Sequence, residues 1–332
     1  MLGADAKELI YAPVADDLDK VIANMAGVSA SQGSEHPPEI EARLAQVLST
    51  PGKRIRPAMT LLTSRLWGRI PDERTLRMAT AVELLHVASL IHDDTVDSAD
   101  TRRGQATASN LWGGNVAVLL GDFLFATSAT FVCDTNSVRL IRRFAQTIAE
   151  LSRGELNEII SAWSTDTDRE AYFRRIFDKT ATLFSTAAES GAVLGEGDEE
   201  SVCRIRDYGY NLGMAYQVLD DLLDYEATSE AIGKPVANDL ANGVLTLPAI
   251  LAIESGEAIT AISAAFSAAP EDRPRLLAAA HKAICASDAL DRSRGIAQKY
   301  IAKATKCLDG LPRSGSLESL LLLTDYIGSR RF

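Results

Sequence analysis

Residues 74–92 read RTLRMATAVELLHVASLIH, and they run directly into the acidic group DDTVD at residues 93–97. After the first turn this stretch is apolar nearly all the way around a helix, which is typical of a helix at the centre of a bundle. A second stretch, GMAYQVLDDLLDY at residues 213–225, repeats the arrangement with the acidic group DDLLD at residues 220–224. The two stretches predict an all-α fold in which long, buried helices present acidic groups.

Helical periodicity also runs through most of the remaining chain, and very little of the chain alternates as a strand does. Segments rich in Gly, Pro, Ser and Asp separate the expected helices, and none is long enough to be a convincing interdomain linker. The sequence therefore predicts a single all-helical domain over residues 1–332, larger than a four-helix bundle. The other expected helices span residues 116–132, 138–162, 170–193, 200–225, 244–266, 273–287, 291–308 and 316–328.

The composition is that of an ordinary soluble globular protein, with 332 residues of which 46% are hydrophobic and 24% are charged. A protein that binds the phosphates of nucleic acid needs positive charge, so a net charge of -11 argues against this function. The four cysteines form no CxxC pair, so reduced thiols in a cytoplasmic protein are expected rather than a zinc site or disulfides. No secretory signal and no run of about 18 uncharged apolar residues is present, so no membrane span is expected.

The acidic groups place carboxylates side by side, because residues four apart stack on one face of a helix. Asp93 would pair with Asp97, and Asp220 with Asp224. Like charges at this spacing repel, and neither interval contains Lys or Arg to compensate them. A hard divalent cation is the natural counter-ion, and Mg²⁺ fits best because it binds through a few carboxylates while water or substrate phosphate fills its other positions.

A single DDxxD group is equally well read as a solvated helix end. Two copies behind long apolar runs favour the metal interpretation, because an apolar helix would bury part of these charges at high cost without partners. Two such helices can point carboxylate pairs at each other across a bundle core, as carboxylate metal sites do in other helical proteins. The pair of groups therefore predicts a site that handles diphosphates.

Basic residues lie beside both acidic groups in the sequence. Arginine offers bidentate hydrogen bonds to phosphate oxygens, and lysine offers a point charge. Each basic group alone is typical of a solvated surface, but their placement predicts a mixed site in which one diphosphate binds through metal and another binds cations directly. The residues are Lys53, Arg54, Arg56, Arg102, Arg103, Lys179 and Lys234.

The order of the motifs resembles that of the trans-isoprenyl diphosphate synthases, the polyprenyl synthetase family, and is most like the long-chain bacterial members. The motifs are GKRIRP, LLHVASLIHDDTVDSADTRRG, GNVAVLLGDFLFA, SRGELNE, FDKTATLF, YQVLDDLLDY and GKPVANDLANGVLTLP, and they cover about residues 50–250. The resemblance implies an all-α bundle around a deep central cavity, the isoprenoid synthase type I fold, usually as a homodimer. It also implies head-to-tail condensation of isopentenyl diphosphate with an allylic diphosphate.

The resemblance assigns roles to individual residues. The residues that would ligate Mg²⁺ are Asp93, Asp97 and Asp220, with Asp94, Asp221 and Asp224 as further ligands or as holders of the ligands. The residues that would hold the allylic diphosphate directly are Arg102, Lys179 and Lys234. The residues that would hold isopentenyl diphosphate are Lys53, Arg56, His86 and Arg103. The residues that would face the reacting carbons are Thr180 and Gln217.

Product length is expected to depend on the residues one turn before Asp93. Ala88 and Ser89 are small, and Ala88 stands where short-chain members of the family often carry an aromatic side chain. This resemblance implies a product of thirty carbons or more, although some twenty-carbon synthases also have a small residue there and use a deeper stopper. Two positions depart from the commonest family pattern, which has Gly at Ala237 and Lys at Val244.

Four other readings remain open, and one of them, a metal-binding or interaction protein without catalysis, leaves the basic groups unexplained. A shorter product would make the chain a farnesyl or geranylgeranyl diphosphate synthase. A class I terpene cyclase shares the fold and metal-triggered ionisation, but it needs no second diphosphate site such as GKRIRP would supply. A non-catalytic subunit of a heteromeric synthase is the fourth reading, but such subunits generally lose one acidic group, and both are complete here.

Overall fold

The structure is a computed structural model that describes residues 4–29, 37–102, 104–166, 168–226 and 237–329. Helices make up most of it, and the only described strands are the two short ones of a ribbon, β1 (Thr101–Arg102) and β2 (Gln105–Ala106). The prediction of an all-α fold is confirmed. Arg103 and Lys234 lie outside the described residues.

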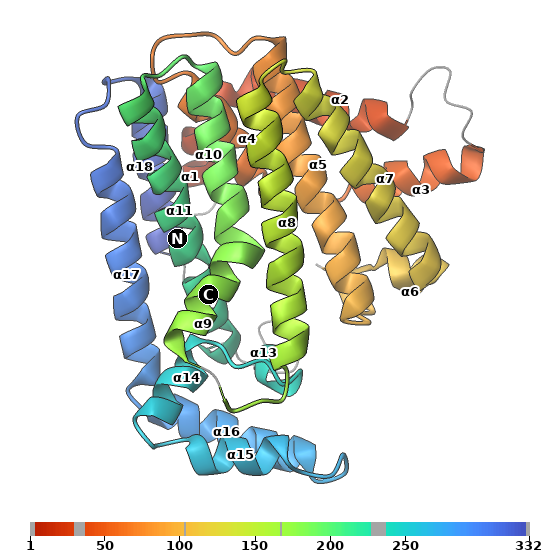
Figure 1. The fold of residues 1–332 in the computed structure, drawn as a ribbon, viewed down its shortest axis with the longest axis vertical. Coiled ribbons are helices and arrows are strands. Elements are labelled where there is room, and N and C mark those ends of the chain that lie inside the picture. Colours follow the sequence, from red (N-terminus) through yellow and green to blue (C-terminus); the bar gives the residue numbers. More distant parts are fainter. Residues whose placement is uncertain (1–3, 30–36, 103, 167, 227–236, 330–332) are drawn as a thin grey trace. The chain divides into compact units, whose positions relative to one another are not determined.

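The chain divides into two compact units, which are described separately here, and the single-domain assignment stays a prediction. Unit 1 comprises Met1–Ile148, Leu183–Gly209 and Leu308–Leu322, and unit 2 comprises Ala149–Thr182, Tyr210–Cys307 and Leu323–Phe332. Three long helices are divided between the two units: α8 (Val138–Ser161), α11 (Glu199–Glu226) and α18 (Gly315–Gly328). Figure 1 shows the described elements in sequence colours.

Unit 1 is built around α5 (Glu73–Val96), the long apolar helix expected from residues 74–92. The helix begins where the side chain of Asp72 accepts a hydrogen bond from the backbone N–H of Thr75 over 3.0 Å, a standard N-cap. Its central side chains, such as Leu84 and Leu85, are fully buried. The other elements wholly in unit 1 are α1 (Ala4–Tyr11), the 3₁₀ turn η1 (Ala12–Val14), α2 (Ala15–Ser29), α3 (Pro38–Leu48), α4 (Ile55–Ser64), α6 (Ala108–Trp112) and α7 (Gly114–Cys133), and unit 1 also takes nearly all of α10 (Thr182–Leu194).

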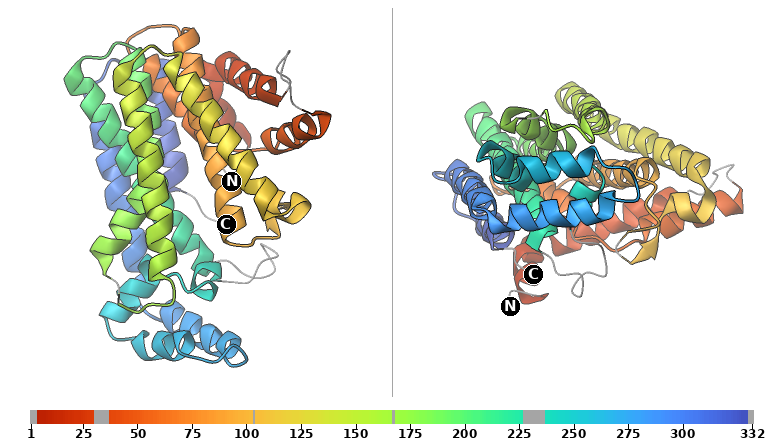
Figure 2. Two further views of the ribbon diagram at one scale, coloured as in Figure 1. Left: turned by 45° about the vertical axis from the view of Figure 1, so that its right-hand side comes forward. Right: turned by 90° about the horizontal axis from the view of Figure 1, so that it is seen from below.

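Helix α7 packs beside α5, as the ribbon views in Figures 1 and 2 agree. Among the described helices it is the one long and apolar enough to cross a membrane by length and composition, with 20 residues and a mean hydropathy of 1.9. A core helix passes the same test, and Asp122 interrupts its apolar run. The absence of a membrane span therefore stays a prediction.

Unit 2 carries the second acidic group near the end of α11. Residues 244–266, expected as one helix, form two, because the chain turns at Gly256 with a positive φ of 80°. Helices α15 and α16 lie side by side (Figures 1 and 2). The elements of unit 2 between its long helices are α9 (Arg169–Ile176), the π-helical turn η2 (Phe177–Ala181), α13 (Asn238–Ala241), α14 (Leu247–Glu254), α15 (Ile259–Phe266), α16 (Arg273–Ala286) and α17 (Ala289–Cys307).

Candidate functional site

The first acidic group lies at the C-terminal end of α5. Helical backbone continues into Asp97, whose N–H donates to the carbonyl of Asp93 over 2.8 Å. Asp93 and Asp97 therefore lie one turn apart, as their spacing predicts. Asp93 is half-buried and Asp97 is exposed, so neither residue of this pair is fully buried.

The middle residue of this group, Asp94, is held inside the protein. It is 7% exposed, and Nε of Arg102 donates to its Oδ1 over 2.6 Å. Arg102 reaches it from the β1–β2 ribbon, which turns through Gly104 with a φ of 77°. Arg102, expected to hold a diphosphate directly, thus compensates a buried carboxylate in this structure.

Two histidines precede the first acidic group on α5. His86 is half-buried, two helical turns before Asp93. The Nε2 atom of His92 lies 3.1 Å from the carbonyl oxygen of Val118 on α7, and its ring packs 5.1 Å from that of Phe125. Gly121 makes this contact possible, because a Cβ there would overlap the His92 ring.

The basic segment GKRIRP gives its three cations different surroundings. Lys53 is exposed. Arg54 has a left-handed backbone, φ 53°, and its Nη1 donates to Oε1 of the buried Glu83 over 2.6 Å. Arg56 is half-buried with its guanidinium 4.6 Å from the centre of the Phe184 ring. Arg54 therefore has an internal partner, and Lys53 and Arg56 are the cations assigned to substrate.

In unit 2, a hydrogen-bonded chain starts at the buried Asp221. The hydroxyl of Tyr172 donates to Oδ2 of Asp221 over 2.6 Å, and Nε2 of Gln217 donates to Oδ1 over 2.7 Å. Thr180 Oγ1 in turn donates to Oε1 of Gln217 over 2.6 Å. The structure thus brings together Thr180 and Gln217, which were assigned to the same task, and links both to the second acidic group.

Burial dominates the electrostatics of this group. It raises the pKa of Asp221 to about 7, against the hydrogen bonds from Tyr172 and Gln217, which favour the charged form. Burial and the charge of Asp221 also raise the pKa of the Tyr172 hydroxyl well above its ordinary value. Tyr172 therefore stays a hydrogen-bond donor over the physiological range.

The outer residues of the second group differ from each other. Asp220 is exposed. Asp224 accepts the backbone N–H groups of Asn238 and Asp239 over 3.1 and 3.0 Å, and so holds the start of α13. That start requires a left-handed residue, and Ala237 supplies it with a φ of 58°. The common family glycine at this position is explained by this backbone conformation.

Asp239 is an acidic residue of this site that the sequence reasoning missed. Its pKa is raised well above the ordinary value by burial and by the charges of Asp221, Asp224 and Glu158. The sequence signal was present in the NDL of the GKPVANDLANG motif. Asp239 reaches the site because α13 packs against the end of α11, and this tertiary contact cannot be predicted from local sequence pattern.

Lys179 lies in the π-helical turn η2, a rare geometry that is frequent at functional sites. Its Nζ is 2.9 Å from Oε2 of Glu155, and it also forms an ion pair with Glu158. Both glutamates lie on α8 in the SRGELNE motif, and neither was assigned a role from sequence. Gly154 allows the close approach, because a Cβ there would lie 2.8 Å from the backbone nitrogen of Lys179.

The described residues contain no preassembled group of three or more His, Cys, Asp or Glu side chains that would hold a metal ion by themselves. The donors present are hard carboxylate oxygens, which suit Mg²⁺. Magnesium is commonly bound by one or two carboxylates plus substrate phosphates, so pairs such as Asp93 and Asp97 fit it.

The two residues proposed to control product length differ in burial. Ala88 is fully buried, at 0% exposure. Ser89 is partly exposed, and its hydroxyl donates to the backbone carbonyl of His86 over 2.9 Å. A larger side chain at Ala88 must therefore find its space inside the protein.

Comparison with known proteins adds a family to this geometry. The profile of the polyprenyl synthetase family matches residues 37–283. Heptaprenyl diphosphate synthase component 2 of Geobacillus stearothermophilus is 37% identical over 323 residues, which are 97% of this chain and 98% of the relative. The resemblance carried by the sequence motifs is confirmed.

Solved structures agree with this result. A decaprenyl diphosphate synthase from Rhodobacter capsulatus superposes with a TM-score of 0.88 at 33% identity, covering 97% of this chain and 98% of that one. A polyprenyl synthase from Caulobacter crescentus CB15, complexed with calcium and isoprenyl diphosphate, superposes with a TM-score of 0.86 at 32% identity and covers 98% of both chains.

Proposed function

Because this chain belongs to the polyprenyl synthetase family, we propose that it is a Mg²⁺-dependent trans-prenyltransferase that condenses isopentenyl diphosphate with an allylic diphosphate. The names of the similar proteins, heptaprenyl and decaprenyl diphosphate synthases, support a long product of thirty carbons or more. The calcium bound to the Caulobacter crescentus homologue supports a divalent cation, and the carboxylate donors of this chain favour Mg²⁺.

The residues proposed to hold Mg²⁺ are Asp93, Asp97 and Asp220, the more accessible members of the two acidic groups. The bound metal would neutralise the diphosphate leaving group and so lower the barrier to breaking the allylic C–O bond. Asp94 and Asp221 each accept hydrogen bonds from protein side chains. These contacts indicate that Asp94 and Asp221 orient the neighbouring metal ligands rather than bind the metal themselves.

The remaining residues act on the two organic substrates. Lys179 would exchange Glu155 and Glu158 for the allylic diphosphate. Lys53, Arg56 and His86 would hold isopentenyl diphosphate so that its double bond faces the allylic carbon. Once the allylic C–O bond has broken, the double bond would donate its electron pair to the allylic cation, and the carbocation so formed would lose a proton to the released diphosphate to give the product.

One observation carries this proposal within unit 2. The chain of hydrogen bonds from Asp221 through Gln217 to Thr180 ends next to Lys179, so one network links a member of the acidic group to the oxygens assigned to the allylic cation. Preorganised oxygens of this kind stabilise developing positive charge without reorganising during the reaction.

The test is an assay with labelled isopentenyl diphosphate, Mg²⁺ or EDTA, and separate primers of ten, fifteen and twenty carbons. Chromatography of the dephosphorylated products should give chains of thirty carbons or more with Mg²⁺ and none with EDTA. Products that stop at fifteen or twenty carbons would support the prenyltransferase reaction but contradict the assignment of a long product. Cyclic hydrocarbon without incorporation of label would favour a class I terpene cyclase.

We further propose a cytoplasmic homodimer. On the apolar helix α7, Leu119 is 67% exposed and Val118 is 41% exposed, which is the kind of surface that associating chains cover. The name component 2, printed for the Geobacillus stearothermophilus relative, favours a second candidate, a subunit that needs a different chain. Sedimentation of the purified chain, with the same assay, separates the two: a dimer active alone supports the first candidate, and an inactive chain supports the second.

A further inference from the structure

A basic pocket lies in unit 1, among residues that have no assigned catalytic role. It has a volume of about 490 Å³ and is formed by the start of α8 together with α10 and the start of α11. This size is ordinary for a small-ligand site. Its lining includes four arginines and one acid: Arg139, Arg142, Arg143, Arg206 and Glu189.

The arginines of the pocket differ in their ion-pair partners. Arg139 pairs with Glu199 at 2.6 Å and with Glu189 at 3.1 Å, and these carboxylates raise its pKa. Arg206 has a longer contact, 3.3 Å, to the adjacent Asp207. Within the described part of the chain, no ion-pair partner is found for Arg142, which is exposed.

The spacing of the α8 arginines adds to this imbalance. Arg139, Arg142 and Arg143 stand three and four residues apart on one helix, where like charges repel. A chain with a net charge of -11 thus places four guanidinium groups around one hollow. Cations gathered in this way favour the binding of an anion between them.

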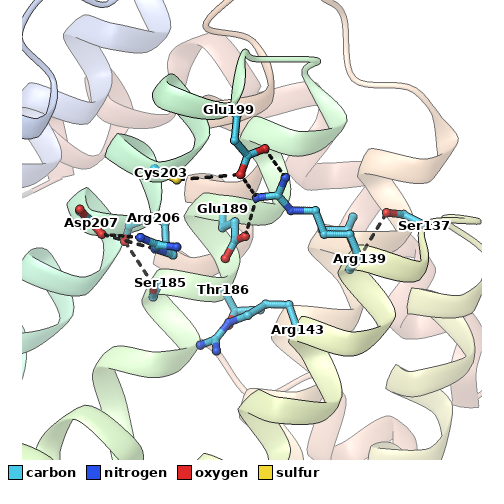
Figure 3. A network of polar contacts seen from close by, with 11 residues as sticks. Ser137, Arg139, Arg143, Ser185, Thr186, Glu189, Glu199, Cys203, Arg206 and Asp207 are labelled. Atoms are coloured by element: carbon cyan, nitrogen blue, oxygen red, sulfur yellow. Dashed lines mark hydrogen bonds and ion pairs between the residues drawn. The ribbon is translucent and has the colours of Figure 1, made fainter.

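Two buried threonines hold Arg143 at the pocket. Nε of Arg143 donates to Oγ1 of Thr186 over 2.9 Å, and that hydroxyl lies 2.6 Å from Oγ1 of Thr147. Both threonines are fully buried. Figure 3 shows Arg139, Arg143 and Arg206 around Glu189 in this network. The guanidinium group of Arg143, fixed in this way, loses little entropy when an anion binds.

We propose that this arginine pocket binds a phosphate or diphosphate group without a metal ion. Planar guanidinium groups match phosphate oxygens with paired hydrogen bonds, and several of them from two helices suit the multiple charges of a diphosphate. The group has two possible sources, free inorganic diphosphate or the head group of a prenyl diphosphate. Val138, 73% exposed on the pocket lining, gives a prenyl chain an apolar surface to lie on.

The test is isothermal titration of the full chain with inorganic diphosphate in EDTA, which removes metal-dependent binding. Arg142→Gln combined with Arg206→Gln should weaken one class of binding by about tenfold or more, because charge-assisted hydrogen bonds are lost. Arg275→Gln combined with Arg174→Gln is the matched control: it removes the same charge from two arginines of α16 and α9, whose side chains are 75% and 60% exposed. Lys53→Ala should weaken the other class, at the proposed substrate site.

Equal binding curves for the pocket variant and its control would overturn the proposal, provided that circular dichroism shows both variants folded. A pocket variant that binds diphosphate normally but sediments differently would also overturn it, and would make the arginines a contact between chains. Titration with farnesyl diphosphate then distinguishes the sources: tighter binding than inorganic diphosphate, lost on Val138→Ser, identifies a prenyl ligand. These titrations measure binding and need no turnover, so their outcome is independent of whether the proposed synthase activity is found.

Discussion

Tyr172 donates its hydroxyl hydrogen to Asp221 over 2.6 Å, and both side chains are buried. The contact joins the helix before the π-helical turn to the second acidic group, across 49 residues of sequence. A buried carboxylate is costly unless its oxygens are satisfied, and Tyr172 and Gln217 together satisfy both oxygens of Asp221. The position of the acidic group therefore depends on a residue outside every acidic motif.

Tyr172→Phe should lower both stability and turnover. Leaving one oxygen of Asp221 without its donor should cost about 1–3 kcal/mol in the free energy of unfolding. Turnover should fall more than affinity for isopentenyl diphosphate, because the substitution disturbs the orientation of Gln217 and Thr180. Urea unfolding and steady-state kinetics measure both effects, and Tyr326→Phe, on α18, is the control for loss of a hydroxyl. Unchanged kcat in Tyr172→Phe would show that the contact is structural only.

The metal-free protein should lose stability as pH rises toward neutrality. The pKa of Asp221 is about 7, raised from 3.8 chiefly by burial, so between these values the folded state holds a proton that the unfolded state has released. This contribution is fully present below the unfolded pKa and is lost as pH rises through about 7. Tm in EDTA should therefore fall across this window.

Asp221→Asn removes the titrating group, so the Tm of this variant should change less with pH. In the unmodified protein, adding Mg²⁺ with inorganic diphosphate should also reduce the change of Tm with pH. Scanning calorimetry at closely spaced pH values makes the comparison. Identical slopes for the protein and for Asp221→Asn would show that another group controls this window.

Gly154→Ala should displace the turn that carries Lys179. Its Cβ would lie 2.8 Å from the Lys179 backbone nitrogen, so the π-helical turn must move. A displacement of catalytic groups by a fraction of an ångström to 1 Å costs about tenfold to a hundredfold in rate. Gly27→Ala is the control, because a Cβ at that helical position meets nothing within 4 Å and should raise stability slightly. Full activity in Gly154→Ala would mean that the turn tolerates the shift.

Ala237→Gly should relieve backbone strain at the start of α13. The left-handed backbone at Ala237, φ 58°, costs about 1 kcal/mol, which glycine does not incur. Greater freedom of glycine in the unfolded chain offsets most of this gain, so Tm should stay equal or rise slightly. Ala241→Gly, in the same helix with ordinary helical backbone, should lower Tm instead. Comparable losses in both variants would contradict the strain at Ala237.

Ala88→Phe tests the control of product length. If the buried methyl group of Ala88 lines the tunnel for the growing chain, phenylalanine should shorten the product while Mg²⁺-dependent condensation continues. If Ala88 instead packs in a filled core, the variant should lose about 1–3 kcal/mol of stability with no change in product. Product chromatography together with thermal unfolding distinguishes the outcomes, and Ser89→Phe gives the matched comparison one residue further along α5.

Local pattern was sufficient for the long helix α5 and for the spacing of the acidic pair that ends it. The apolar run before Asp93 predicted a buried helix, and α5 spans Glu73–Val96. The four-residue spacing of Asp93 and Asp97 placed them one turn apart, as found. Such features follow from sequence because helical periodicity and side-chain direction repeat over a few residues.

The hydrogen-bonding and ion-pair partners of the site residues were set by tertiary structure. The sequence by itself determined an all-α chain, its two acidic groups and the family to which their motifs belong. Only the folded chain decided that Tyr172 holds Asp221, that Glu155 and Glu158 hold Lys179, and that four arginines surround one pocket. The physical reason is that burial and pairing of charges depend on helices distant in sequence meeting in space, whereas periodicity records only which face of each helix is apolar.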